Sequence, residues 1–244
     1  MNSGFIHLIL GNPIVNRTAN NIFELYQEEA FKRPFFRRYP LQSVRGRMLT
    51  NYFSQNSGVP YKYIAGTGNT TPFEHAPQAV NEALQLIKDR ARLAVGKSVD
   101  FNEVLSAAYM EKQKMSFHSD SEPGLGTVLS SLSLGSEALM HFRLRAKFKD
   151  VKRAKGHSQN ELTIRLRHGD VLVMQGQDIQ DKYEHTVVPT NFRIAATARF
   201  IDATGRLSQF PDDFQDDSSP HMESDFIPTY PINKYNNPHD TLAR

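Results

Sequence analysis

Two segments in the first hundred residues carry apolar side chains at helical spacing. Residues 19–31 show an apolar residue every three or four positions, which is typical of a helix with one buried face. A second helix is predicted from Pro77 to Val95, because proline suits a first helical turn and Gly96 follows the last apolar position. The apolar faces consist of Ile22, Leu25 and Tyr26 in the first helix, and of Val80, Leu84, Ile87 and Ala91 in the second.

After Gly96 the pattern changes to short apolar runs and to alternation of apolar with polar residues. Alternation is typical of half-buried strands, and a short continuous apolar run is typical of a buried one. We predict strands over 103–119, 127–135, 140–145, 162–167, 171–174 and 192–201. Because helices lie only ahead of these strands, the order favours an α+β fold whose main body is a sandwich or jelly roll.

The chain divides into three segments by pattern and composition. Residues 1–75 are expected to form an N-terminal extension and candidate substrate-recognition lid, and residues 76–205 to form the jelly-roll core. Residues 206–244 combine acidic side chains with prolines and serines, which is typical of an irregular tail.

Composition restricts the chemistry and the compartment. The 244 residues include no cysteine, which excludes disulfides, cysteine-ligated zinc, iron–sulfur clusters and a thiol nucleophile. Any metal would therefore be held by His, Asp or Glu. The apolar stretch Phe5–Leu10 has no basic residue before it and is too short to span a bilayer. We therefore expect no membrane association and an intracellular protein, cytoplasmic or nuclear, that is not secreted.

Positive charge is concentrated in one stretch, although the formal net charge of the whole chain is only +3. The stretch Lys32–Arg47 contains no acidic residue and is interleaved with aromatic ones. Two interpretations are open: a surface that binds a polyanion such as nucleic acid, or a solvated face beside a few core aromatics. The basic residues are Lys32, Arg33, Arg37, Arg38, Arg45 and Arg47, and the aromatic ones Phe35, Phe36 and Tyr39.

Three residues form a candidate metal site. His118 and Asp120 are two positions apart, so on a strand their side chains would project from the same face. The third candidate is His185, because it is the only histidine followed by arginines eight and fourteen positions later, at Arg193 and Arg199. Two histidines and one carboxylate are the ligand set of non-haem iron, with open positions for co-substrate and oxygen. Zinc can take the same ligands.

The two arginines favour iron over zinc. Arg193 and Arg199 are six positions apart, so on one strand they share a face and could bind the two ends of a small dicarboxylate. The intervening Ala195, Ala196 and Ala198 make the surface between them small-sided, as a ligand cavity requires. A zinc hydrolase has no evident need for an organic dicarboxylate.

The motif His118-Ser-Asp120-Ser-Glu122-Pro, followed by His185 and by Arg193-x5-Arg199, resembles the AlkB-like family of Fe(II)/2-oxoglutarate dioxygenases. The likeness extends from about Arg47 to Ile201. It implies a double-stranded β-helix, or jelly roll, with supporting N-terminal helices. It also implies Fe(II), 2-oxoglutarate as co-substrate, and O2.

The resemblance assigns roles to the residues of the motif. His118, Asp120 and His185 would hold Fe(II). The keto acid end of 2-oxoglutarate would lie near Arg199, and the distal carboxylate would be bound by Arg193 and by Tyr109. The chain departs from the family at Ala107 and Ala195, where well-known members carry asparagines that contact the co-substrate.

Two further residues match positions that meet the substrate in this family. Tyr63 would stack on an extruded base, and Glu122 would read an exocyclic amine. A core aromatic at Tyr63 and a solvated loop acid at Glu122 are the alternative interpretations.

Three functions are consistent with these residues. The first is oxidative N-dealkylation of an alkylated nucleobase or nucleic acid by C–H hydroxylation, which the basic stretch Lys32–Arg47 favours. The second is the same iron chemistry on a small molecule or a protein side chain, which the modest net charge and the missing asparagines favour. A non-catalytic jelly-roll binding module fits the complete ligand set least well.

Overall fold

The computed structural model describes residues 4–38, 41–42, 48–50, 52–60, 70–148 and 161–202. The predicted tail 206–244 lies outside these residues, as does Tyr63. No helix in the described ranges is long and apolar enough to cross a membrane.

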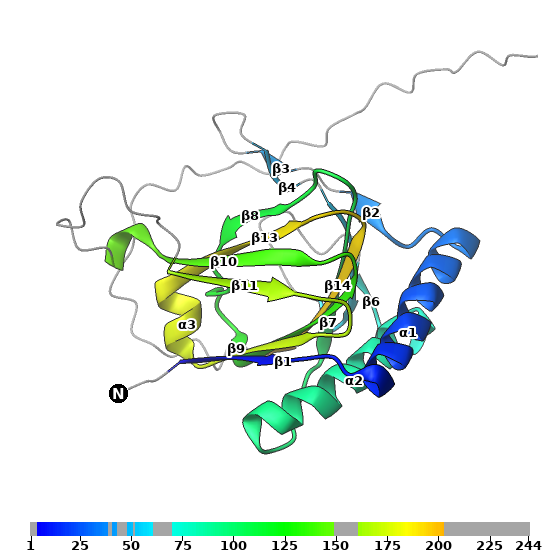
Figure 1. Ribbon diagram of the computed structural model, residues 1–244, viewed down its shortest axis with the longest axis horizontal. Helices are drawn as coiled ribbons and strands as arrows, with labels where there is room; N and C mark the ends of the chain where they lie inside the picture. Colours follow the sequence, from blue (N-terminus) through cyan, green and yellow to red (C-terminus); the bar gives the residue numbers. More distant parts are fainter. Residues whose placement is uncertain are drawn as a thin grey trace, which may run out of the picture. The chain divides into compact units, whose positions relative to one another are not determined.

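Two antiparallel sheets form the body of the protein (Figure 1). The larger sheet runs in the order β1 (Phe5–Ile9), β12 (Val171–Gln175), β9 (Leu125–Gly135), β14 (Arg193–Ile201), β7 (Glu103–Tyr109), β5 (Phe53–Gly58) and β2 (Arg37–Arg38), and β6 (Thr70–Thr71) pairs in parallel with β5. The smaller sheet runs in the order β11 (Leu162–Leu166), β10 (Ala138–Leu144), β13 (Tyr183–Pro189) and β8 (Met115–His118). A separate two-stranded sheet pairs β3 (Leu41–Gln42) with β4 (Met48–Thr50).

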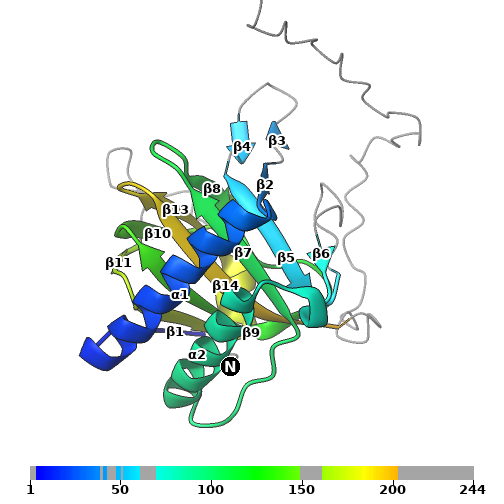
Figure 2. The same cartoon turned by 90° about the vertical axis from the view of Figure 1, so that its right-hand side faces the viewer.

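The smaller sheet lies against one face of the larger sheet, and two helices cover the other face (Figures 1 and 2). One apolar cluster joins the two sheets through residues such as Leu129 of β9, Phe142 of β10 and Leu172 of β12. This arrangement of helices and facing antiparallel sheets is the predicted α+β jelly roll, which is confirmed.

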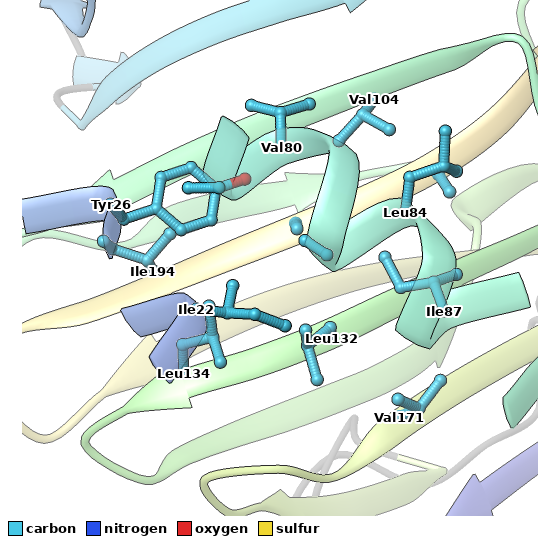
Figure 3. Packing of buried hydrophobic residues seen from close by; sticks show 14 of the residues in the cluster. Ile22, Tyr26, Val80, Leu84, Ile87, Val104, Leu132, Leu134, Val171 and Ile194 are labelled. Carbon is cyan, nitrogen blue, oxygen red and sulfur yellow. The ribbon is translucent and has the colours of Figure 1, made fainter. Parts of the chain in front are cut away.

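The two long helices bury their apolar faces against the larger sheet. These helices are α1 (Pro13–Lys32) and α2 (Gln78–Val95), and Figure 3 shows their side chains against those of β7, β9, β12 and β14. The labelled residues are Ile22 and Tyr26 of α1, Val80, Leu84 and Ile87 of α2, and Val104, Leu132, Leu134, Val171 and Ile194 of the strands. The apolar faces predicted for both helices are therefore the ones that pack.

The ends of the helices follow from single residues. Helix α2 ends at Gly96, which has a left-handed φ of 77°, as the sequence predicted. Helix α1 begins six residues earlier than predicted. The Asn12 side chain accepts hydrogen bonds from the backbone N–H groups of Ile14 and Val15, both at 3.0 Å, and Pro13 occupies the first turn.

The order and extent of the predicted elements need correction. The segment 103–119 forms two strands, because a turn at residues 110–114 separates β7 from β8 and puts Lys112 at a φ of 64°. Strands β1 to β6 and β13 were not predicted. The prediction that helices lie only ahead of the strands is wrong, because α3 (Gln177–Lys182) lies between β12 and β13. Short 3-10 turns occur at Phe73–His75 and Ala146–Phe148.

The described part of the basic stretch separates charges from aromatics. Phe35 is buried beside Tyr26, and Phe36 stacks on the same tyrosine at 6.0 Å between ring centroids. The basic side chains remain exposed at Lys32, Arg33, Arg37 and Arg38. The aromatics therefore belong to the core, while the charges form a solvated surface.

Candidate functional site

The three candidate metal ligands meet at the edge of the smaller sheet. His118 ends β8 and lies directly opposite His185 in the adjacent strand β13. Asp120 follows just beyond the end of β8, in a loop. One ligand atom from each of the three side chains lies within 4.8 Å of the others. The Asp120 carboxylate is 3.9 Å from His118 Nε2 and 3.5 Å from His185 Nε2.

The orientation of the His118 ring is fixed by the backbone. Its Nδ1 lies 2.9 Å from the carbonyl oxygen of Ser116, an arrangement in which Nδ1–H donates the hydrogen bond. Nε2 then carries the lone pair and faces Asp120, which is the tautomer that a metal ligand requires.

Burial and charge set the protonation states of the other two residues. Burial and the neighbouring His118 lower the pKa of His185 to about 3, although Asp120 acts in the opposite direction. His185 is therefore neutral near pH 7. Burial opposes ionisation of Asp120, but the charges of His185, His118 and Arg199 together lower its pKa below the ordinary value. Asp120 is therefore ionised near pH 7.

These residues line a cavity of about 70 Å³ between the two sheets. The predicted co-substrate residues Tyr109, Arg193 and Arg199 line the same cavity, together with apolar side chains from both sheets. The structure thus brings six of the eight predicted site residues to one place. The donor set of two imidazole nitrogens and one carboxylate fits Fe(II), with room beside it for further ligands.

Arg193 is buried with hydrogen-bonding capacity to spare. It is 1% exposed, and its Nη2 donates to Ser133 Oγ at 2.9 Å. Its Nε and Nη1 have no hydrogen-bond partner among the described residues. A buried guanidinium with two unmade hydrogen bonds is costly, and burial lowers its pKa. A carboxylate bound there would satisfy both groups, which is how the residues fit the distal end of 2-oxoglutarate.

Arg199 has an ion-pair partner that sequence reasoning missed. Its Nε and Nη2 donate to the two carboxylate oxygens of Glu103 at 2.7 and 2.8 Å. Glu103 also accepts a hydrogen bond from Asn56 Nδ2 at 2.5 Å. One signal was available in the sequence: Glu103 precedes Tyr109 by six residues, the same spacing as Arg193 to Arg199. In the antiparallel register of β7 with β14, Arg193 lies opposite Tyr109 and Arg199 lies opposite Glu103.

Aromatic and small residues occupy the cavity wall between the two arginines. Tyr109 lies opposite Arg193, and its ring packs on that of Tyr52 at 5.0 Å between centroids. Burial raises the pKa of Tyr52 to about 12. Ala107 and Ala195 face each other across β7 and β14 and both line the cavity. The positions where the family carries asparagines are therefore apolar here.

The prediction that three alanines line the surface between Arg193 and Arg199 is wrong for two of them. Ala196 and Ala198 do not line the surface between the arginines. They belong to the core under the helices, because alternate residues of a strand point to opposite faces. Only Ala195 of the three alanines lines the cavity.

The structure does not bring either of the two predicted substrate residues into the described cavity lining. Tyr63 is outside the described residues. Glu122 is exposed in the turn between β8 and β9, where its carbonyl accepts a hydrogen bond from the Leu125 N–H, and it does not line the cavity. Their roles stay predictions.

Comparisons with known proteins give a family match and several similar proteins. The model of the 2OG-Fe(II) oxygenase superfamily matches residues 7–207. The alpha-ketoglutarate-dependent dioxygenase alkB homolog 3 of Homo sapiens is 31% identical over 142 residues, and that of Bos taurus is 30% identical over 148 residues. Each match covers 57% of this chain and 45% of the relative, so the chain spans about half the length of these relatives. The solved structure of OsALKBH1 superposes with a TM-score of 0.46 and 17% identity, over 80% of this chain and 97% of that chain.

Proposed function

The chain belongs to the 2OG-Fe(II) oxygenase superfamily, and from that premise we propose that it is an AlkB-like dioxygenase acting by C–H hydroxylation. The observation that carries the proposal is the meeting of His118, Asp120 and His185 in the cavity that also contains Arg193. Two imidazoles and a carboxylate suit Fe(II), and a buried arginine with unmade hydrogen bonds suits an acidic co-substrate.

The residues of the chain have separate tasks in this proposal. His118, Asp120 and His185 hold the metal. Arg193 and Tyr109 bind the distal carboxylate of 2-oxoglutarate, and Arg199 stands at the keto acid end. Bound Fe(II) and 2-oxoglutarate supply the oxidative decarboxylation that activates O2 for hydroxylation of a C–H bond. Apolar side chains such as Met140 and Leu172 line the same cavity and exclude water from it.

The proposed substrate is an alkylated nucleobase in nucleic acid, from which hydroxylation of an N-alkyl carbon releases an aldehyde. Exposed Arg37 and Arg38 form the edge strand β2, and Arg38 is in register through Phe53 with Ala108, next to Tyr109. The basic edge therefore lies at the Tyr109 end of the cavity-lining strand. A positive edge beside the site is suited to a phosphate backbone.

We also propose that residues 1–75 contribute a substrate-recognition lid to the core 76–205, with Tyr63 and Glu122 as contacts to the base, whereas β1, α1 and β5 of the same segment pack into the fold itself. In support, Tyr52 packs on Tyr109 of the cavity wall.

Succinate formation tests the reaction. Protein loaded with Fe(II) and 2-oxoglutarate is offered methylated oligonucleotides or a panel of metabolites and peptides, and succinate and formaldehyde are both measured. We expect both products with methylated oligonucleotides and neither with the His118→Ala variant. Turnover only with metabolites or peptides would show that the substrate is a small molecule or a protein side chain rather than nucleic acid. Absence of succinate with every substrate, together with equal iron binding by wild type and His118→Ala, would contradict the enzyme itself.

A further inference from the structure

The cavity places a permanent positive charge beside the candidate metal ligands. Arg199 is 3% exposed and lines the same cavity as His118, Asp120 and His185. Like charges in a buried site repel one another strongly because little water screens them. An uncompensated guanidinium here would oppose the binding of a divalent cation.

Glu103 compensates this charge. It is 0% exposed, and both of its oxygens accept hydrogen bonds from Arg199. A paired geometry of this kind fixes the orientation of the guanidinium as well as cancelling its charge. Asn56 of β5 binds the same carboxylate from the other side, so neighbours on the two flanking strands hold Glu103 in place.

Arg193 shows the opposite arrangement in the same cavity. Among the described residues no carboxylate pairs with it, and two of its donor nitrogens are unsatisfied. One buried arginine is therefore neutralised by the protein and the other is left to a ligand. With a divalent cation on the Asp120 carboxylate, each end of the cavity then carries one net positive charge, which matches an acid with two carboxylates.

We propose that Glu103 is a positioning residue for the metal: by holding and neutralising Arg199, it allows a divalent cation to bind beside a buried arginine. This inference rests on the proposed function. It concerns a residue outside the metal-ligand set, and it predicts that the charges of Glu103 and Arg199 act on metal affinity with opposite signs.

The test is the affinity for Mn(II), a stand-in for Fe(II) that resists oxidation, measured by calorimetry without co-substrate at pH 7.5. Glu103→Gln keeps the shape and removes the charge, and we expect about tenfold weaker binding. Glu103→Asp keeps the charge and should bind nearly as wild type does. Arg199→Gln leaves a negative charge behind and should bind at least as tightly as wild type.

A matched control removes the same charge far from the cavity. Glu137 pairs with Arg165 at 3.7 Å, and both side chains are largely exposed, so Glu137→Gln should leave Mn(II) affinity unchanged.

Two results would overturn the inference: unchanged affinity in Glu103→Gln, or weaker binding in both Glu103→Gln and Arg199→Gln, which indicates a structural role only. If Glu103→Gln does not fold, Arg199→Gln decides the matter, because weaker binding there contradicts the proposal. Wild type that binds no Mn(II) sensitive to His118→Ala would overturn the proposed function, and this inference with it.

Discussion

Asp120 and His185 differ in charge although both line the same cavity. Burial favours the neutral form of each group, and for His185 it lowers the pKa to about 3. Asp120 resists this effect because His185, His118 and Arg199 lie near its carboxylate and favour the ionised form, so its pKa is lowered as well. A neutral imidazole next to a carboxylate is the state in which both can bind a metal without first losing a proton.

Replacement of Arg193 tests the co-substrate site at the scale of one residue. Arg193→Lys keeps a positive charge but loses the planar fork that matches a carboxylate. We expect the affinity of Mn(II)-loaded protein for 2-oxoglutarate to fall about 10- to 100-fold, while the affinity for Mn(II) itself stays unchanged. Arg165→Lys at an exposed site is the control. Equal 2-oxoglutarate affinity in Arg193→Lys and wild type would show that Arg193 does not bind the co-substrate.

His168 should make stability depend on pH. Its Nδ1 accepts a hydrogen bond from the Gly135 N–H at 2.9 Å, and burial lowers its pKa. The unfolded chain therefore binds a proton more readily, so stability is complete above about pH 6.5 and falls as the pH decreases below it. Urea unfolding at pH 7.5 and 5.5 measures this loss. In His168→Gln we expect the pH dependence to shrink by up to one proton, and an unchanged dependence would exclude this role.

The sequence predicted which residues form the site, but it did not predict which residues pair with them. His118, Asp120 and His185 were found because residue types and spacing carry the information. The pairing of Glu103 with Arg199 depends on the register of β7 with β14, which no local pattern specifies. The Ala196 and Ala198 error arose in the same way, since their side of the strand was decided by the packing of the helices.

At the scale of elements, the predictions succeeded where a segment has its own signal. Helix α2 has a proline, a clear apolar face and a terminal glycine, and it was predicted to within one residue. Strand β13 was missed because its seven residues mix charged, polar and apolar side chains. It forms through pairing with β10 and β8, and so depends on residues distant in sequence.

The cap at the start of α1 should contribute to the stability of the protein. The Asn12 side chain caps two backbone N–H groups, and its loss leaves them without that partner. We expect Asn12→Ala to lower the free energy of unfolding by about 1 kcal/mol, measured by urea denaturation. Helix α1 packs on the face of the larger sheet opposite the smaller sheet (Figure 2), whereas the cavity is lined by residues of both sheets. Mn(II) affinity should therefore not change. A lower metal affinity in this variant would show that the helix start and the site are coupled.

At the scale of the whole molecule, the two faces of the larger sheet differ in function within the described residues. One face of the larger sheet packs on the helices and forms the main apolar core. The other face carries the buried arginines and meets the smaller sheet, which brings two of the three metal ligands. The basic edge strand β2 belongs to the larger sheet, so a polyanion bound there would lie on the same scaffold as the cavity.

Salt dependence tests whether that edge binds nucleic acid. Arg33 and Arg37 are both exposed, and replacing both with Gln should weaken binding of a methylated oligonucleotide regardless of its sequence. We expect the slope of log affinity against log salt concentration to become shallower by about 1 for each charge removed, measured by fluorescence anisotropy. If the affinity of wild type for the oligonucleotide does not change with salt concentration, a small-molecule or protein substrate is favoured.

The central claim is that one cavity holds a metal on His118, Asp120 and His185 and an acidic co-substrate on Arg193. Anomalous diffraction from crystals grown without oxygen in the presence of Fe(II) and 2-oxoglutarate measures both positions at once. The account predicts an iron peak bound by these three side chains and a carboxylate of the co-substrate on the Arg193 guanidinium. An iron peak elsewhere, or a co-substrate that leaves Arg193 untouched, would contradict it.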